Sequence, residues 1–245
     1  MRRDVRILFA SVALGAVAQW GHEIPEAVSR METFRIASID VRGVRYLTTD
    51  EVIAQLEITP ETSVWTDTEV WTERLRAHAM VRDAKITRKV PNGLLVEVVE
   101  RRPIALAPTP TLEPIDAEGY RLPLDPARYR LDLPIISTHH FPPDGSRLFP
   151  EDVRALVAEV DHLMNADTAF HQMVSSVRWG ERGTLIARWT EPRVEFLLPR
   201  QASPTRLREG LVALANAMSR SPGDVPQAID LRFTDQVVVR RARDR

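Results

Sequence analysis

The 245-residue chain contains no cysteine, which excludes disulfides, thiolate metal sites, iron–sulfur clusters and cysteine nucleophiles. It also lacks an excess of either charge, because 33 basic side chains are balanced by 34 acidic ones and the formal net charge is -1. A chain without a positive field has little with which to hold a phosphate backbone. We therefore expect no nucleic acid among its partners.

Familiar catalytic motifs are absent as well. The sequence has no Gly-x-Ser-x-Gly nucleophile motif, no phosphate-binding loop and no dinucleotide-binding glycine motif. His139 and His140 are adjacent but lack a third ligand at metal-site spacing, which favours a surface loop. We therefore expect no catalytic residue, no metal, no cofactor and no small-molecule substrate. A hydrolase that uses the two histidines is the alternative from the enzyme class.

The N-terminus has the pattern of a targeting segment. Arginines lie within residues 1–6, and an apolar run follows at residues 7–20. Because a positive flank stays in the cytoplasm, residues 1–6 are expected there and the bulk of the chain on the outer side. As a helix, residues 7–20 would span roughly 21 Å against about 30 Å of hydrocarbon. Two interpretations stay open: a short single-pass signal anchor, or a signal peptide cleaved after Ala18. Residues 21–33 are expected to form a linker.

Residues 34–102 are expected to form a small domain with the element order β-α-α-β-β. Apolar and polar residues alternate from Phe34 to Val41, as in a half-buried strand. Two short amphipathic helices follow, and the second is predicted to start at the capping-box pair Thr66 and Glu69. The strands Val81–Val90 and Leu94–Glu100 are then joined by a Pro-Asn-Gly turn.

Residues 103–241 are expected to form a larger mixed domain built on an antiparallel sheet, so the predicted fold class is α+β. A proline-rich stretch opens this part. One amphipathic helix is predicted from Asp152 and a second after the capping residue Ser203, with three strands between them. The last two predicted strands are Ala228–Phe233 and Gln236–Arg240, and residues 242–245 form a tail.

Several motifs occur in the order found in one protein family. The run VPNGLLVEVVERRPIAL, residues 90–106, is similar to the end of the small domain of the bacterial cell-division proteins FtsQ, called DivIB in Gram-positive bacteria. Glu100, Arg101 and Pro103 match the Glu-Arg-x-Pro of that family. Residues 36–58, 112–124 and 229–240 resemble the family's opening strand and helix, its Ile-Asp-x-x-Gly segment and its closing strand pair. The resemblance covers about residues 34–240.

The resemblance implies a POTRA domain at residues 34–102, a C-terminal β domain at residues 103–241 and a non-enzymatic scaffold of the division complex. It further implies FtsB- and FtsL-like division proteins as partners, regulation of septal peptidoglycan synthesis, and a single-pass location in the inner membrane at the septum. The POTRA domain would contact other division proteins, with Val52 and Leu56 on one wall of a groove. Glu100, Arg101 and Pro103 would set the domain junction. Another POTRA-containing receptor, acting in outer-membrane protein assembly or secretion, is the alternative.

The C-terminal strand is the candidate binding site for the partner. It is β-prone and close to the end of the chain, so a sheet edge is expected there. An exposed edge carries unpaired N–H and C=O groups, to which a partner segment can add as a further strand. Arginines at positions 240, 241 and 243 would attract an acidic partner. An ordinary protected terminal strand is the alternative. The candidate partner-binding residues are Phe233, Gln236, Val237, Val238, Val239 and Arg240.

Overall fold

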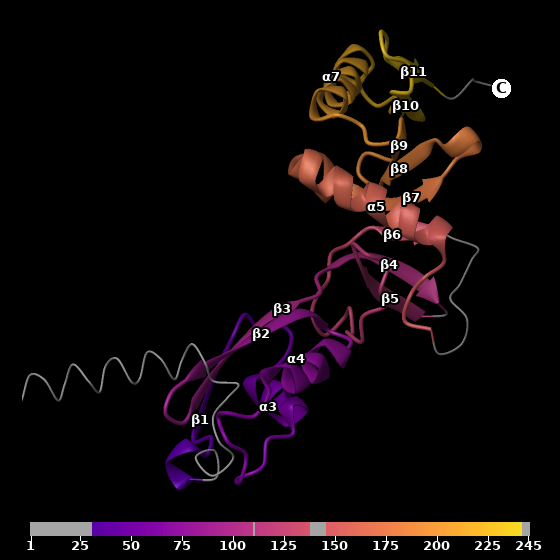
Figure 1. Ribbon diagram of the computed structural model, residues 1–245. Helices are drawn as coiled ribbons and strands as arrows, with labels where there is room; N and C mark the ends of the chain where they lie inside the picture. The colour runs from indigo at the N-terminus through magenta and orange to yellow at the C-terminus, as the bar shows by residue number, and fades with distance from the viewer. Residues whose placement is uncertain (1–30, 110, 138–145, 242–245) are drawn as a thin grey trace, which may run out of the picture. The chain divides into compact units, whose positions relative to one another are not determined.

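The computed structural model describes residues 31–109, 111–137 and 146–241. The chain forms two compact units that meet in sequence between Arg101 and Arg102 (Figure 1). The expected apolar helix at residues 7–20 and the pair His139 and His140 lie outside the described residues. No helix within the described ranges is long and apolar enough to cross a membrane.

The first unit is a three-stranded sheet with two helices, in the predicted order. Strand β3 lies at the centre, paired in parallel with β1 and antiparallel with β2. Gly43 ends β1 at a φ of 86°, and a Cβ there would lie 2.0 Å from the carbonyl oxygen of Val98, so only glycine fits. The elements are β1 (Ser38–Arg42), α3 (Thr49–Leu56), α4 (Thr68–Ala77), β2 (Val81–Lys89) and β3 (Gly93–Glu100), preceded by the 3-10 turn η1 (Glu32–Phe34).

Both helices of this unit begin at side-chain caps. Thr48 and Glu51 form a capping box at α3, where the Glu51 carboxylate accepts the Thr48 N–H at 2.7 Å. Helix α4 is capped by Asp67, whose carboxylate accepts the Glu69 N–H at 3.0 Å. The predicted cap at Thr66 is therefore wrong by one residue, because the carboxylate of Asp67 is the better-placed acceptor.

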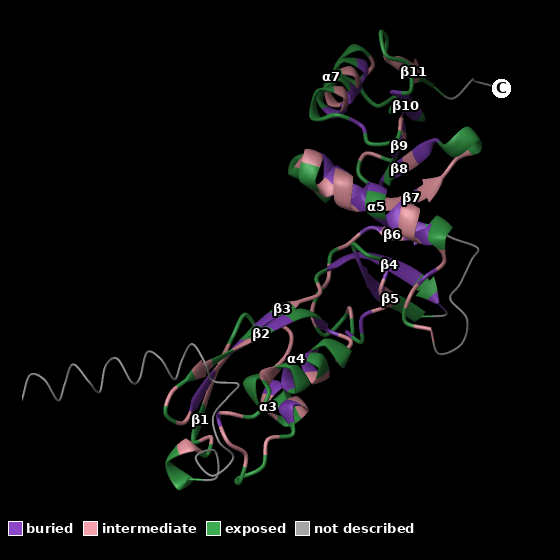
Figure 2. Cartoon of the chain, viewed as in Figure 1, coloured by how far each residue is buried: buried purple, intermediate pink, exposed green. Residues whose placement is uncertain are grey.

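The second unit is one eight-stranded sheet in the order β11-β10-β9-β8-β7-β6-β4-β5. Figure 2 shows β4, which lies next to the edge strand β5, as an almost continuously buried strand. The strands are β4 (Pro103–Thr109), β5 (Thr111–Asp116), β6 (Ile135–Ser137), β7 (Val174–Trp179), β8 (Leu185–Trp189), β9 (Val194–Leu198), β10 (Ala228–Asp230) and β11 (Val238–Arg240). The helices are α5 (Glu151–Ala166), α6 (Thr168–Gln172) and α7 (Pro204–Arg220), with the 3-10 turn η2 (Glu181–Gly183).

The α+β class is confirmed, but the sheet of the second unit is mixed where an antiparallel one was expected. The pairs β4–β6, β6–β7 and β9–β10 are parallel. Parallel neighbours need a crossover connection, and α5 and α7 provide it between β6 and β7 and between β9 and β10. Both helices contribute to one apolar core with the sheet. The opposite sheet face is partly exposed along β7, β8, β9 and β11, and we call this part of the sheet the open face. Gly210 lets α7 pack closely against Leu231, the residue after β10, since a Cβ at position 210 would lie 2.6 Å from a methyl group of Leu231.

Candidate partner-binding site

Strand β11 lies at one edge of the eight-stranded sheet, as expected from its place in the sequence. It pairs antiparallel with β10, and no other strand in the described part of the chain pairs with it. The strand is shorter than predicted, because Gln236 and Val237 precede it. The other edge, β5, is partly covered: Pro114 accepts the Leu122 N–H at 2.8 Å. Strand β11 is therefore the more accessible edge.

The hydrogen bonds of β10 determine which backbone groups of β11 face outward. Glu195 donates to the carbonyl of Gln227, and the N–H of Leu231 donates to Leu197, so the odd-numbered residues of β10 bond to β9. Ala228 and Asp230 consequently bond to β11, where their partners are Arg240 and Val238. Backbone direction alternates along a strand, so the N–H and C=O of Val239 point away from the sheet. These are the groups available to an added strand.

Arg206, near the start of α7, holds the connection between β10 and β11. Its guanidinium donates to three backbone carbonyls, those of Leu231 at 3.0 Å, Gln236 at 2.5 Å and Phe233. The side chain is only 11% exposed. Sequence reasoning missed this residue, because nothing in the local pattern of α7 shows that one of its arginines reaches a loop some 30 positions later.

A buried carboxylate fixes the other end of the edge strand. Asp230 has no exposed side-chain surface and accepts hydrogen bonds from Arg232 at 2.7 and 2.8 Å and from Arg240 at 2.6 Å. The hydrogen bonds from Arg232, together with the charges of both arginines, hold the pKa of the Asp230 carboxyl below its usual value. Arg240 therefore has an internal ion-pair partner, and so does Arg241, which pairs with Asp224. Both were expected to attract an acidic partner, and in the structure each also pairs with a carboxylate of this chain.

Apolar surface borders the edge on its helix side. Phe233 is 43% exposed and Val212 on α7 is 59% exposed. A pocket of about 450 Å³ lies between α7 and the residue that precedes β11. An apolar side chain of an added strand would have a place to bind next to the edge. The pocket is lined by Thr205, Arg208, Glu209, Val212, Ala213, Asn216 and Val237.

The POTRA residues expected to contact a partner are part of the core. Val52 is 1% exposed and Leu56 is completely buried, so neither offers surface to another protein and this prediction is corrected. They follow the spacing of a helix face that packs on the sheet, and a groove wall has the same spacing. Sequence alone does not separate the two cases.

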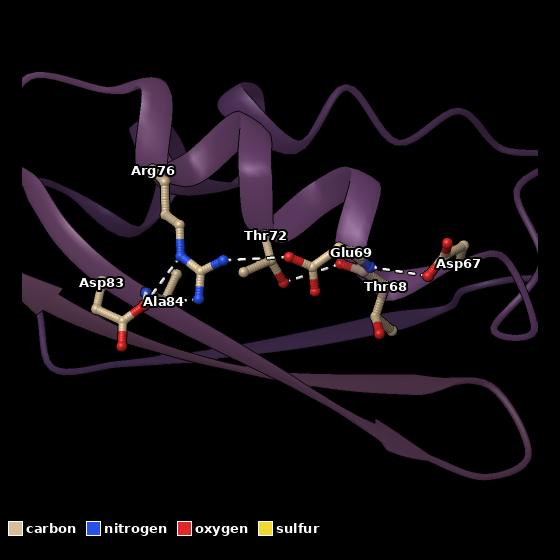
Figure 3. Close-up of polar contacts among 7 residues, drawn as sticks. All are labelled: Asp67, Thr68, Glu69, Thr72, Arg76, Asp83 and Ala84. Atoms are coloured by element: carbon tan, nitrogen blue, oxygen red, sulfur yellow. Dashed lines mark hydrogen bonds and ion pairs between the residues drawn. The ribbon is translucent and has the colours of Figure 1, made fainter.

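Helix α4 is fastened to the edge strand β2 through charged side chains (Figure 3). Arg76 donates to Asp83 at 3.0 Å and to Glu69 at 3.1 Å. The hydrogen bond from Arg76, assisted by the backbone N–H of Ala84, holds the pKa of Asp83 below its usual value. These charges therefore have internal partners and stabilise the packing of the helix on the strand.

Glu100 has a structural role at the end of the first unit. Its carboxylate accepts the N–H groups of Tyr46 and Leu47 at 2.9 and 2.8 Å, and so fixes the loop before α3. Arg101 donates its N–H to Met80 at 2.8 Å, and Pro103 begins β4 in the second unit. The predicted junction residues thus include the last hydrogen-bonded positions of the first unit.

Metal chemistry finds no support in the described ranges. No group of three or more histidine, aspartate or glutamate side chains within them could hold a metal ion. His162 contacts the carbonyl oxygen of Ala202 at 3.0 Å, and Asp116 accepts backbone N–H groups in its turn. These polar side chains stabilise local structure.

Comparisons with known proteins agree with this arrangement. Residues 34–101 match the POTRA domain of FtsQ type. Proteins named cell division protein FtsQ are similar to the chain: that of Rhodothermus marinus is 28% identical over 217 residues, covering 86% of this chain and 79% of the relative. That of Bradyrhizobium diazoefficiens is 26% identical over 220 residues, covering 89% and 60%. That of Myxococcus fulvus is 25% identical over 136 residues, covering 55% and 48%, so the match spans about half of that relative.

Among solved structures, the major extracytoplasmic domain of the trans isomer of DivIB from Geobacillus stearothermophilus is 18% identical with a TM-score of 0.29, covering 50% of this chain and 97% of that one. The FtsQ-type match of the first unit and the FtsQ relatives that extend over both units carry the assignment. The chain therefore carries an FtsQ-type POTRA domain and is similar over most of its length to bacterial proteins named cell division protein FtsQ.

Proposed function

We propose that the chain is a non-enzymatic scaffold of the division complex that binds FtsB- and FtsL-like partners by β-strand addition at β11. Through that contact it helps regulate septal peptidoglycan synthesis. Residues 7–20 would hold it in the inner membrane at the septum, with the bulk of the chain on the outer side. The observation that carries the proposal is the free edge of β11, where the backbone of Val239 points outward.

The edge is prepared for binding before a partner arrives. Arg206 fixes the connecting loop, and Asp230 fixes the strand through Arg240. A preformed edge costs little ordering entropy on binding, so more of the interaction energy appears as affinity. The exposed ring of Phe233 and the pocket at Val237 supply apolar contacts on one side of the added strand.

A proline at position 239 tests the proposal. Val239→Pro removes the N–H that points away from the sheet. Gln236→Pro is a less direct test, because the chain at Gln236 is held by a hydrogen bond from the Arg206 guanidinium to the Gln236 carbonyl. We expect the dissociation constant for the FtsB–FtsL pair of the source organism to rise roughly fivefold or more, since one backbone hydrogen bond and close strand approach are lost.

The matched control is Val239→Ala, which loses the same side-chain contacts but keeps the N–H and should bind within about twofold. Thermal unfolding of both variants tests whether the second unit folds. If Val239→Pro folds and binds the pair as tightly as Val239→Ala, strand addition at β11 is wrong. This comparison is cleaner than deleting the C-terminal residues, which would also remove Arg240 from Asp230.

A further inference from the structure

The open face of the second sheet carries a row of residues that runs across five strands. The register places Ser176, Arg188, Glu195, Ala228 and Arg240 side by side, on β7, β8, β9, β10 and β11. Four of the five side chains are polar. The small residue in the row, Ala228, lies between Glu195 and Arg240, and the space left above its methyl group is hollow.

That hollow is a pocket of about 490 Å³, which we call the Ala228 pocket. Ala228 forms its floor, and apolar side chains from β8 and β9 form part of its wall. Its volume is within the range of pockets that bind small ligands. Its lining residues are Ile186, Arg188, Arg193, Val194, Glu195, Leu197, Gln227, Ala228 and Arg240.

The charge of the pocket is positive. Three arginines line it against one carboxylate, Glu195, which already accepts hydrogen bonds from Arg188 at 2.7 Å and faces Arg178 at 3.5 Å. Arg193 is exposed and forms no ion pair or side-chain hydrogen bond with the residues that the structure describes. One guanidinium is thus free to bind a ligand, and two more are half-exposed beside it.

We propose that the Ala228 pocket binds a carboxylate side chain from an acidic peptide segment. Guanidinium groups present paired N–H donors that match a carboxylate. A doubly charged phosphate fits less well, because Glu195 would repel it, whereas the methylenes of a glutamate side chain match the walls at Ile186 and Leu197.

The segment belongs to the partner that adds at β11, and this part of the inference rests on the proposed function. Arg240 lies on β11 itself, so the pocket borders the edge. Two strand spacings separate β10 from a strand added beyond β11, which is about 10 Å. Residues that flank the added strand can therefore reach the pocket across the open face.

The first test uses the full chain and a fluorescein-labelled decapeptide of glutamate, with a glutamine decapeptide as the uncharged control. At low salt we expect the glutamate peptide to bind and the glutamine peptide not to bind. Arg193→Gln and Ala228→Leu should each weaken binding about tenfold, the first by removing the free guanidinium and the second by filling the hollow. Arg220→Gln removes an exposed arginine from α7, on the other side of the sheet, and should change binding less than twofold.

Equal effects of Arg193→Gln and Arg220→Gln would overturn the assignment, since binding would then follow overall charge. Displacement of the peptide by inorganic phosphate at the same concentration would overturn the choice of a carboxylate. Thermal unfolding tests whether Ala228→Leu folds, and Arg193→Gln, at an exposed position, tests the pocket without a packing change.

The second test measures the FtsB–FtsL pair with the same variants and with Val239→Pro. Weaker binding for both the pocket variants and Val239→Pro supports one partner that spans both sites. If only Val239→Pro weakens binding, the shared-partner inference is wrong and the proposed function stands. If only the pocket variants weaken binding, strand addition is wrong and the pocket remains a binding site.

Discussion

Replacing Arg206 with methionine tests whether a single side chain of α7 holds the edge strand β11 in place. Methionine keeps the apolar stem and removes every donor to Leu231, Phe233 and Gln236. Hydrogen bonds to charged groups contribute about 1.5–3 kcal/mol each when buried. Two of these carbonyls belong to exposed residues and would be hydrated in the variant. We therefore expect the free energy of local unfolding of β11 from β10 to fall by about 2–3 kcal/mol in total.

Amide hydrogen exchange at Val238 and Arg240 measures this free energy directly, because their N–H groups bond inward to β10. A loss of about 2–3 kcal/mol corresponds to a fall in protection of roughly 30- to 150-fold. Arg208→Met is the matched control two residues further along α7, since Arg208 is 70% exposed and lies 3.7 Å from Asp167. If protection in Arg206→Met changes no more than in Arg208→Met, the argument that Arg206 positions the edge is refuted.

Three further predictions concern stability. Asp230→Asn should destabilise the second unit at neutral pH. Because the pKa of Asp230 is lowered in the folded state, the difference in unfolding free energy from the parent should shrink as the pH falls below about 4. Denaturant unfolding at pH 7 and at pH 3 measures it, and an equal difference at both pH values would contradict this prediction. Glu100→Gln should cost the first unit about 1–3 kcal/mol by weakening the bonds to Tyr46 and Leu47, while unfolding of the second unit stays unchanged; a loss in the second unit alone would refute the assignment. Leu56→Ala should cost about 2–5 kcal/mol by leaving a cavity, and a variant that melts like the parent would show that Leu56 is not in the core.

The sequence predicts those parts of the fold that depend on neighbouring residues. The element order of the POTRA unit follows from periodicity and capping residues, and helix α7 starts at Ser203 with Pro204 in its first turn, as expected. The parallel pairs of the second sheet were not predicted, because strand direction depends on crossovers that no local pattern records.

Prediction of the candidate site has the same limit. The β-prone run at the C-terminus indicated an edge, and the structure places β11 there. The clamp at Arg206 and the buried carboxylate of Asp230 depend on contacts between distant positions or on complete burial, and neither changes the local pattern. Val52 and Leu56 show the converse error, since an apolar helix stripe was assigned to a groove although it fills the core.

The brevity of β11 has a consequence for self-association. Within Val238–Arg240 a single residue, Val239, turns its backbone outward, so the strand proper offers one donor and one acceptor to any chain that approaches. Long, flat edges pair with many other strands and lead to aggregation, whereas so short an edge binds an unrelated strand only weakly. A stable complex then requires side chains that fit the surface around the strand. So short an edge can remain exposed to solvent without joining copies of the same protein into fibres.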